Sequence, residues 1–121
     1  MNIVHWSTCV EYVVHGDARE RCLLGPADSR RHVCLKAPGI SCTETIAFFN
    51  RAVLQPGARL EMHVGATEEI HYILDGQGVF HSGNQSSPCR RGCAIHVAAG
   101  VAHGLTNASD EPIEYLVLGG A

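Results

Sequence analysis

The stretch from residue 57 to residue 76 constrains the fold most, because it places ionisable side chains inside strand-like apolar sequence. In its second half, Glu69 and His71 alternate with the apolar residues on either side of them. Successive side chains of a β-strand point to opposite faces, so these two groups are expected to share one face. The segment just before them contributes His63. A carboxylate and imidazoles on neighbouring strands supply the donor atoms of a metal site.

The rest of the chain shows the pattern of short strands separated by turns rich in Gly, Pro and Asn. Besides a strand around His63, strands are predicted at residues 8–14, 20–24, 31–36, 44–54, 69–74, 79–82, 94–97, 102–107 and 113–118. We predict a hairpin turn at residues 75–78 and a polar loop at residues 83–88. No window sustains a period of 3.6 residues, so little helix is expected. An all-β sandwich or barrel follows from this spacing.

Composition excludes several classes of protein. With 121 residues the chain is predicted to form one domain, and 45% hydrophobic against 17% charged residues excludes a disordered chain. A net charge of −3 without a basic stripe predicts no nucleic-acid partner. No apolar run approaches the roughly 20 residues of a membrane span, and the N-terminus lacks the pattern of a signal peptide. We therefore expect a cytoplasmic protein whose six cysteines are free thiols used in packing or at the surface.

Two motifs with fixed spacing contain the candidate functional residues. The first follows the pattern G-x5-H-x-H-x(3,4)-E-x6-G at Gly57, His63, Glu69 and Gly76, with Gly65 in place of the second histidine. The second follows G-x5-P-x-G-x2-H-x3-N at Gly92, Gly100, His103 and Asn107, with Ala98 where proline is usual. The four motif glycines outside position 65 are expected in turns with unusual dihedrals, and Asn107 is expected to tie a turn.

Together the two motifs resemble the paired motifs of the cupin superfamily, over about residues 42 to 119. The resemblance implies a cupin-type jelly-roll β-barrel, also called a double-stranded β-helix, as a single domain over residues 1–121. Residues 1–40 would then form N-terminal strands that pack on the barrel or on a partner subunit. A homodimer is expected, with Trp6 as an interface residue.

The resemblance also implies a single divalent metal inside the barrel, held by His63, Glu69 and His103. Iron(II) or zinc suits this donor set best, and nickel or manganese are further candidates. The missing histidine at Gly65 leaves a place in the ligand set. His71 could fill it as a fourth ligand, or could instead bond to a ligand or to substrate.

Further candidates surround these ligands. Regular alternation would place Arg59 and Glu61 on the face of His63, as a clamp for an acidic substrate and as a general base, and His71 is a second candidate for catalysis. His81 and His96 lie on neighbouring strands and are candidates for substrate binding. The alternatives are a salt-linked pair at the rim and surface or core histidines. The remaining imidazoles, His5, His15 and His32, are expected to face solvent.

The function these residues predict is a metal-dependent enzyme for a small organic molecule. Its reaction would be of the oxygenase type, or a non-redox cyclisation, isomerisation or lyase reaction, for example in secondary metabolism. The alternative is a metal-free or metal-storing cupin that binds a small ligand or acts as a sensor.

Overall fold

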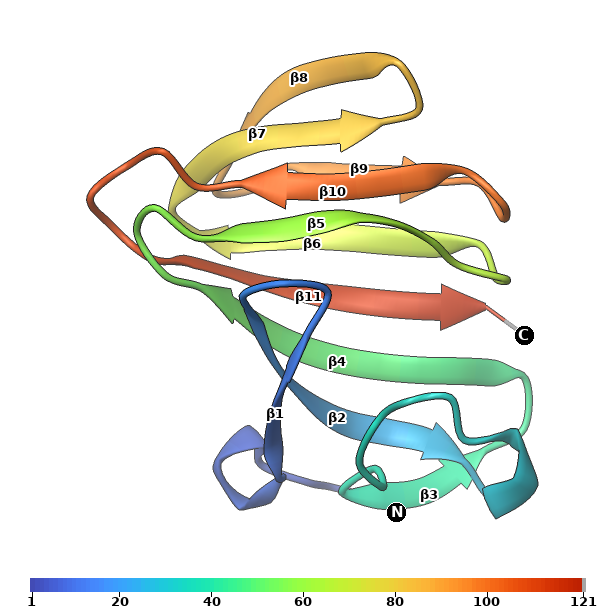
Figure 1. Cartoon of the computed structure of the whole chain (residues 1–121). Helices are drawn as coiled ribbons and strands as arrows, with labels where there is room; N and C mark the ends of the chain where they lie inside the picture. Colours follow the sequence, from blue (N-terminus) through green and yellow to red (C-terminus); the bar gives the residue numbers. More distant parts are fainter. Residues whose placement is uncertain (121) are drawn as a thin grey trace.

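The computed structural model describes residues 1–120, and almost all of its regular structure is β-strand (Figure 1). The strands are β1 Glu11–Val14, β2 Ala18–Pro26, β3 Ile40–Thr43, β4 Ile46–Leu54, β5 Arg59–Val64, β6 Glu69–Asp75, β7 Gln77–Ser82, β8 Gln85–Arg90, β9 Ala94–Val97, β10 Ala102–Thr106 and β11 Ile113–Gly120. Two single turns of 3₁₀-helix, η1 Trp6–Thr8 and η2 Ser29–Arg31, are the helical segments of the described chain. The prediction of an all-β fold is confirmed. Within residues 1–120, no helix has the length and apolar character needed to cross a membrane.

The strands form two sheets that face each other. One sheet has the order β1-β2-β4-β11-β6-β9, with β3 pairing in parallel to β2, and the other has the order β5-β10-β7-β8. All other pairs of strands are antiparallel. From β4 onward the chain passes repeatedly between the two sheets, which is the winding of the expected jelly roll. Segments far apart in the sequence therefore meet on the inner faces.

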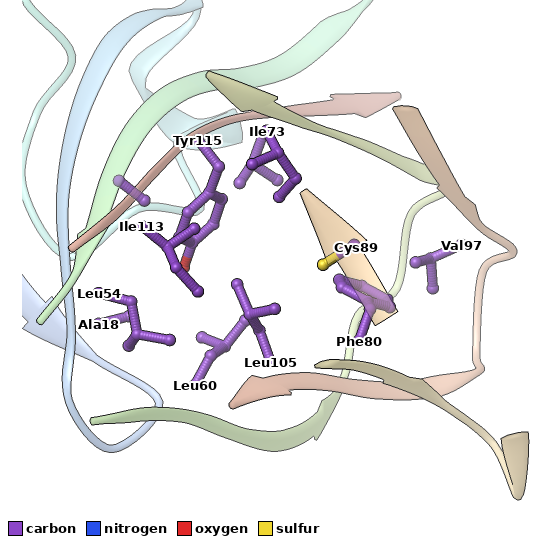
Figure 2. Packing of buried hydrophobic residues seen from close by; sticks show 12 residues of the cluster. Ala18, Leu54, Leu60, Ile73, Phe80, Cys89, Val97, Leu105, Ile113 and Tyr115 are labelled. Atoms are coloured by element: carbon purple, nitrogen blue, oxygen red, sulfur yellow. The ribbon is translucent and has the colours of Figure 1, made fainter. Parts of the chain in front are cut away.

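The apolar core fills the space between the sheets. Figure 2 shows Leu54, Leu60, Leu105 and Ile113 pointing into this space, and Leu54, Leu105 and Ile113 are fully buried. Burying side chains of this size contributes roughly 1.5–3 kcal/mol each. On β11 the inward residues alternate with half-buried ones, as expected for a strand with neighbours on both sides.

The predicted strand at residues 31–36 is wrong. This segment follows η2 as irregular chain, with Val33 and Leu35 exposed. The reason lies in the edges available for pairing: β4 pairs along one edge of β2, and β1 and β3 pair along its remaining length. An apolar alternation forms a strand only where a partner edge is free.

The turn after β6 also differs from the prediction. β6 and β7 belong to different sheets, so residues 75–78 form a corner between the sheets rather than a hairpin. Gly76 has φ +87, and a Cβ there would overlap the carbonyl oxygen of Pro112. The hairpin lies one strand later, where β8 pairs with β7 from Ser82↔Gln85 to Gln77↔Arg90. The loop predicted at residues 83–88 therefore includes part of β8. Only one residue of β8 is buried, so its sequence has no apolar alternation that would indicate a strand.

The expected roles of the turn residues are confirmed. The glycines predicted in turns all have positive φ: Gly57, Gly76, Gly92 and Gly100. Asn107 is buried, and its side-chain N–H groups donate to the carbonyl oxygens of Leu54, Gln55 and Glu111 at 2.8 to 3.2 Å. This amide holds the turn before β11 against the end of β4.

The N-terminal strands join the larger sheet and also reach the smaller one. β1 and β2 form a hairpin, and β2 pairs with β4. At the tip of the hairpin, Gly16 makes an isolated bridge to Leu60 on β5, and the backbone N–H of Glu61 donates to the carbonyl oxygen of His15 at 2.7 Å. The hairpin therefore connects the two sheets on that side of the barrel.

Candidate metal centre

Three side chains from the two motifs come together between the sheets. His63 on β5, Glu69 on β6 and His103 on β10 have ligand-capable atoms that all lie within 4.8 Å of one another. β5 and β10 pair with His63 directly opposite His103, and β6 in the other sheet presents Glu69 to both. Glu69 and His103 are buried, and His63 is half-buried. The structure thus assembles the expected ligand set.

An irregularity in β5 determines which residues accompany His63. The pairing moves from His103↔His63 to Leu105↔Leu60, so three steps along β5 match two steps along β10. An extra residue of this kind is a β-bulge, and it changes which side chains share a face. His63 therefore lines the same cavity as Leu60, whereas Arg59 and Glu61 are exposed. The expectation of regular alternation along this strand is wrong.

Both imidazoles of the cluster are oriented by backbone carbonyls. His63 Nδ1 lies 2.9 Å from the carbonyl oxygen of Glu61, and His103 Nδ1 lies 3.1 Å from that of Val101. An imidazole that donates from Nδ1 keeps a free lone pair on Nε2, and metal-binding histidines are commonly fixed this way. His103 Nε2 is buried without a hydrogen-bond partner, although it lies 3.3 Å from Glu69 Oε1. These residues fit a metal ion, because such an ion would satisfy this nitrogen.

His71 lies beside the cluster. Its ring is almost fully buried, and its Nε2 lies 3.0 Å from Glu69 Oε1. The group of three ligand-capable residues does not include it. The geometry of this structure places His71 against the carboxylate, where its N–H holds Glu69 in position. Its Nδ1 is buried and has no hydrogen-bond partner within the described chain.

The local electrostatics favour an ionised carboxylate and lower the pKa of two of the three neighbouring imidazoles. Burial alone would raise the pKa of Glu69, but the neighbouring imidazoles of His103 and His71 outweigh it and lower the value to about 2. Burial lowers the pKa of both His63 and His71. For His103, burial also acts downward, but Glu69 and the Val101 carbonyl reverse the effect and raise its pKa. At neutral pH the site therefore offers one anionic oxygen ligand.

Gly65 has a steric role beside this carboxylate. A Cβ at position 65 would lie 2.7 Å from Glu69 Oε2, which is closer than such atoms approach. The oxygen of Glu69 therefore extends toward the position where the motif usually has its second histidine. Any side chain at this position would require the carboxylate to move.

A cavity of about 310 Å³ lies against the cluster. His63, Glu69 and His71 form part of its wall, and apolar side chains such as Phe48 and Val117 form another part. A cavity of this size accommodates a small organic molecule.

The cavity also has a second polar wall that we did not predict from the sequence. It is formed by Tyr12, Glu20, Cys34 and Asn50. Glu20 is buried, accepts a hydrogen bond from Asn50 Nδ2 at 3.0 Å, and has its pKa raised to about 7 mainly by burial. The sequence did contain a signal for Glu20. It stands two positions before Cys22 in a predicted strand, and alternate residues of a strand share a face. That face is the inner one.

His15 is exposed, as expected, but it also contacts the cluster, which we did not predict. Its ring stacks on His63 with centroids 3.5 Å apart and an angle of 6° between the planes. It also lines the cavity. Burial lowers its pKa. The sequence offered no signal, because the contact depends on how the β1–β2 hairpin lies against β5.

The remaining candidates lie outside the cavity wall. Arg59 and Glu61 are exposed on β5. His81 lies between the hydroxyls of Ser86 and Thr106, at 2.7 and 3.1 Å. His96 is on the surface, with Nε2 2.6 Å from Glu68 Oε1. The structure does not bring these side chains to the cluster.

The fold and the cluster define a small β-barrel with a candidate metal centre next to a ligand-sized cavity. Residues 50–119, more than half of the chain, match the family model described as "Cupin domain". The protein belongs to the cupin family.

A curated protein is similar to this chain in sequence. An oxalate-binding protein of Thermotoga maritima is 34% identical over 71 residues, which are 58% of this chain and 59% of that protein. The chain thus spans less than two thirds of the length of this curated relative.

Solved structures show the same fold. A crystal structure from Thermotoga maritima, described as a predicted oxalate decarboxylase, has a TM-score of 0.76 and 23% identity and covers 98% of both chains. A polyketide cyclase of Streptomyces resistomycificus has a TM-score of 0.77 and 17% identity, covering 99% of this chain and 79% of the other. The described fold therefore occurs in proteins with different names and activities.

Proposed function

We propose that the protein is a metal-dependent enzyme that acts on a small organic molecule bound in the cavity. The observation that supports this most is the convergence of His63, Glu69 and His103, with both imidazoles oriented by backbone carbonyls. Two imidazoles and one carboxylate leave coordination positions open, which a catalytic site needs and a closed structural site lacks.

The donor set suits iron(II) or zinc, with nickel and manganese as further candidates. A bound ion would supply polarisation of a substrate oxygen or, as iron(II), activation of dioxygen. The protein's contribution is to hold the ligands. His71 donates to Glu69 from within the barrel and fixes the direction of the carboxylate. A carboxylate held in this way would be ready to bind the ion without rearrangement.

Other polar groups in the cavity wall are available to a substrate. His71 Nδ1 and the hydroxyl of Tyr115 are buried without hydrogen-bond partners in residues 1–120. Buried polar groups are nearly always paired, so these two atoms support a ligand with hydrogen-bonding groups of its own. The reaction we propose is of the oxygenase type or a non-redox cyclisation, isomerisation or lyase reaction, for example in secondary metabolism.

A second candidate function is small-ligand binding without catalysis. Glu69 already accepts a hydrogen bond from His71 and lies 3.3 Å from His103, so the carboxylate is compensated by the protein itself. The curated relative is named for binding oxalate. A binding module would use the same cavity and would not need an ion.

Metal analysis distinguishes the two functions. Protein purified without chelators is analysed by emission spectroscopy, together with His63→Ala and His103→Ala variants. The enzyme function predicts close to one metal ion per chain in the wild type and a large loss in both variants. Calorimetric titration with oxalate then follows, on metal-loaded and metal-free protein. If the purified wild type contains no metal and the His63→Ala and His103→Ala variants still bind oxalate, the result would favour the binding module instead.

We also propose a homodimer in the cytoplasm. All six cysteines are free thiols, which suits a reducing compartment. Exposed apolar residues on the outer faces of β1 and β6, such as Val13 and Tyr72, support an interface. Light scattering of the purified protein tests the dimer.

A further inference from the structure

The N-terminal hairpin brings a further imidazole against His63, in a chain whose first motif lacks its second histidine. His15 lies outside residues 50–119, the part of the chain that matches the family model. It reaches the cluster because the tip of the β1–β2 hairpin bridges to Leu60 on β5. Gly65, at the usual position of a second motif histidine, offers no donor atom.

The position of the His15 ring is specific. It stacks on the His63 ring at 3.5 Å, and His63 is in turn 4.3 Å from His103 between ring centroids. The His15 ring also lines the cavity on which Glu69 opens. Among residues 1–120, its ring nitrogens have no hydrogen-bond partner. The ring therefore brings two unused nitrogen atoms to the edge of the metal site.

The backbone of His15 has a left-handed conformation at the tip of the hairpin. His15 has φ +51 and is the one residue other than glycine with positive φ in the described chain. This left-handed conformation is uncommon for residues with a Cβ, although histidine, like asparagine and aspartate, adopts it more often than most. Unfavourable backbone conformations of this kind cluster at functional sites.

The surrounding contacts hold this conformation in place. The Glu61 N–H donates to the His15 carbonyl oxygen at 2.7 Å, and the Asp17 N–H donates to the carbonyl oxygen of Arg59 at 3.0 Å. These bonds lie on both sides of Gly16. The hairpin tip is therefore fixed against β5, and the ring of His15 is presented to His63.

We propose that His15 is a fourth protein ligand of the metal held by His63, Glu69 and His103, in place of the histidine missing at Gly65. In its stacked position His15 is outside the group of three ligand-capable residues, so coordination requires its ring to rotate away from His63. This inference rests on the metal site of the proposed function and adds a ligand from outside the two motifs.

Two substitutions separate coordination from packing. His15→Asn removes the imidazole and tolerates the left-handed backbone, so the metal-free protein should keep its melting temperature. His15→Phe keeps an aromatic ring for the stack and removes both nitrogens. His5→Ala, an exposed imidazole outside the cavity wall, is the matched control.

The affinity for Zn²⁺ is measured by competition with a chromophoric chelator. We expect both His15 variants to bind at least 10-fold more weakly than wild type and His5→Ala to bind equally well. Cu²⁺-loaded protein should show one fewer coordinated nitrogen in His15→Asn by electron paramagnetic resonance. Undiminished Zn²⁺ affinity in His15→Phe, or an unchanged nitrogen count, would overturn the inference and leave the metal site intact. Wild type that binds no metal would overturn the proposed function as well.

Discussion

The buried carboxyl group of Glu20 gives a prediction whose size follows from the structure. Glu20 is 8% exposed in the cavity wall, and its partners among the described residues include an amide donor but no cationic side chain. Burial raises its pKa from 4.5 to about 7. We predict that replacing this carboxyl by the neutral amide of Glu20→Gln stabilises the metal-free protein at pH 8 and has little effect at pH 4.5.

The sign and magnitude follow from proton linkage. Because the folded pKa is above the unfolded one, the folded state binds more protons between pH 4.5 and pH 7. The free energy of unfolding is therefore undiminished below pH 4.5, where Glu20 is protonated in both the folded and the unfolded state. It falls as the pH rises to 7. The difference between a pKa of 4.5 and one of about 7 corresponds to about 3 kcal/mol, at about 1.36 kcal/mol per pH unit. Glu20→Gln keeps an oxygen acceptor for Asn50 and avoids this loss.

The assay is urea unfolding of chelator-treated wild type and Glu20→Gln at pH 4.5, 6, 7 and 8. The difference in free energy of unfolding between the two proteins should grow from near zero to about 3 kcal/mol in favour of the variant. Glu44→Gln, at an exposed carboxylate, is the control and should show no such growth. A difference that stays constant across the series would refute the reasoning that Glu20 pays a burial penalty when ionised.

Three further predictions test individual contacts. His71→Phe should weaken Zn²⁺ affinity by 10-fold or more, because it removes the donor that fixes Glu69; unchanged affinity in a chelator competition would exclude His71 from the site. Asn107→Ala should lower the free energy of unfolding by about 2–4 kcal/mol, because three carbonyl oxygens lose a buried donor; a loss below 1 kcal/mol in urea unfolding would contradict this. Gly76→Ala should cost at least about 1–3 kcal/mol, because φ is +87 and the new methyl group overlaps Pro112; a melting temperature equal to that of wild type would show that the corner can rearrange.

Much of the fold and the central cluster could be predicted because they depend on spacing within short segments. The alternation of Glu69 and His71 correctly placed both on the inner face of β6. The meeting of His63 and His103, forty positions apart, followed from the resemblance of the two motifs to those of cupins, which implied the barrel that pairs β5 with β10. The turns of the two motifs account for the positive φ angles of the motif glycines.

The errors occur where the structure depends on contacts between distant segments. Alternation misplaced Arg59 and Glu61, because the bulge in β5 becomes visible only in its pairing with β10. The ring of His15 meets His63 only after the hairpin has bridged to β5, and nothing in the local sequence shows that bridge. Glu20 was overlooked because a charged residue in a short strand is usually exposed.

The pairing of β2 with β4 also has a practical consequence for anyone who shortens the protein. The region matched by the family model begins at residue 50, inside β4, yet β4 pairs along one edge with β2 from Phe49 to Val53. A fragment trimmed to that region would leave unpaired N–H and C=O groups beside exposed core, which is a template for aggregation. Shortened versions of the protein intended for crystallisation should therefore retain the first hairpin.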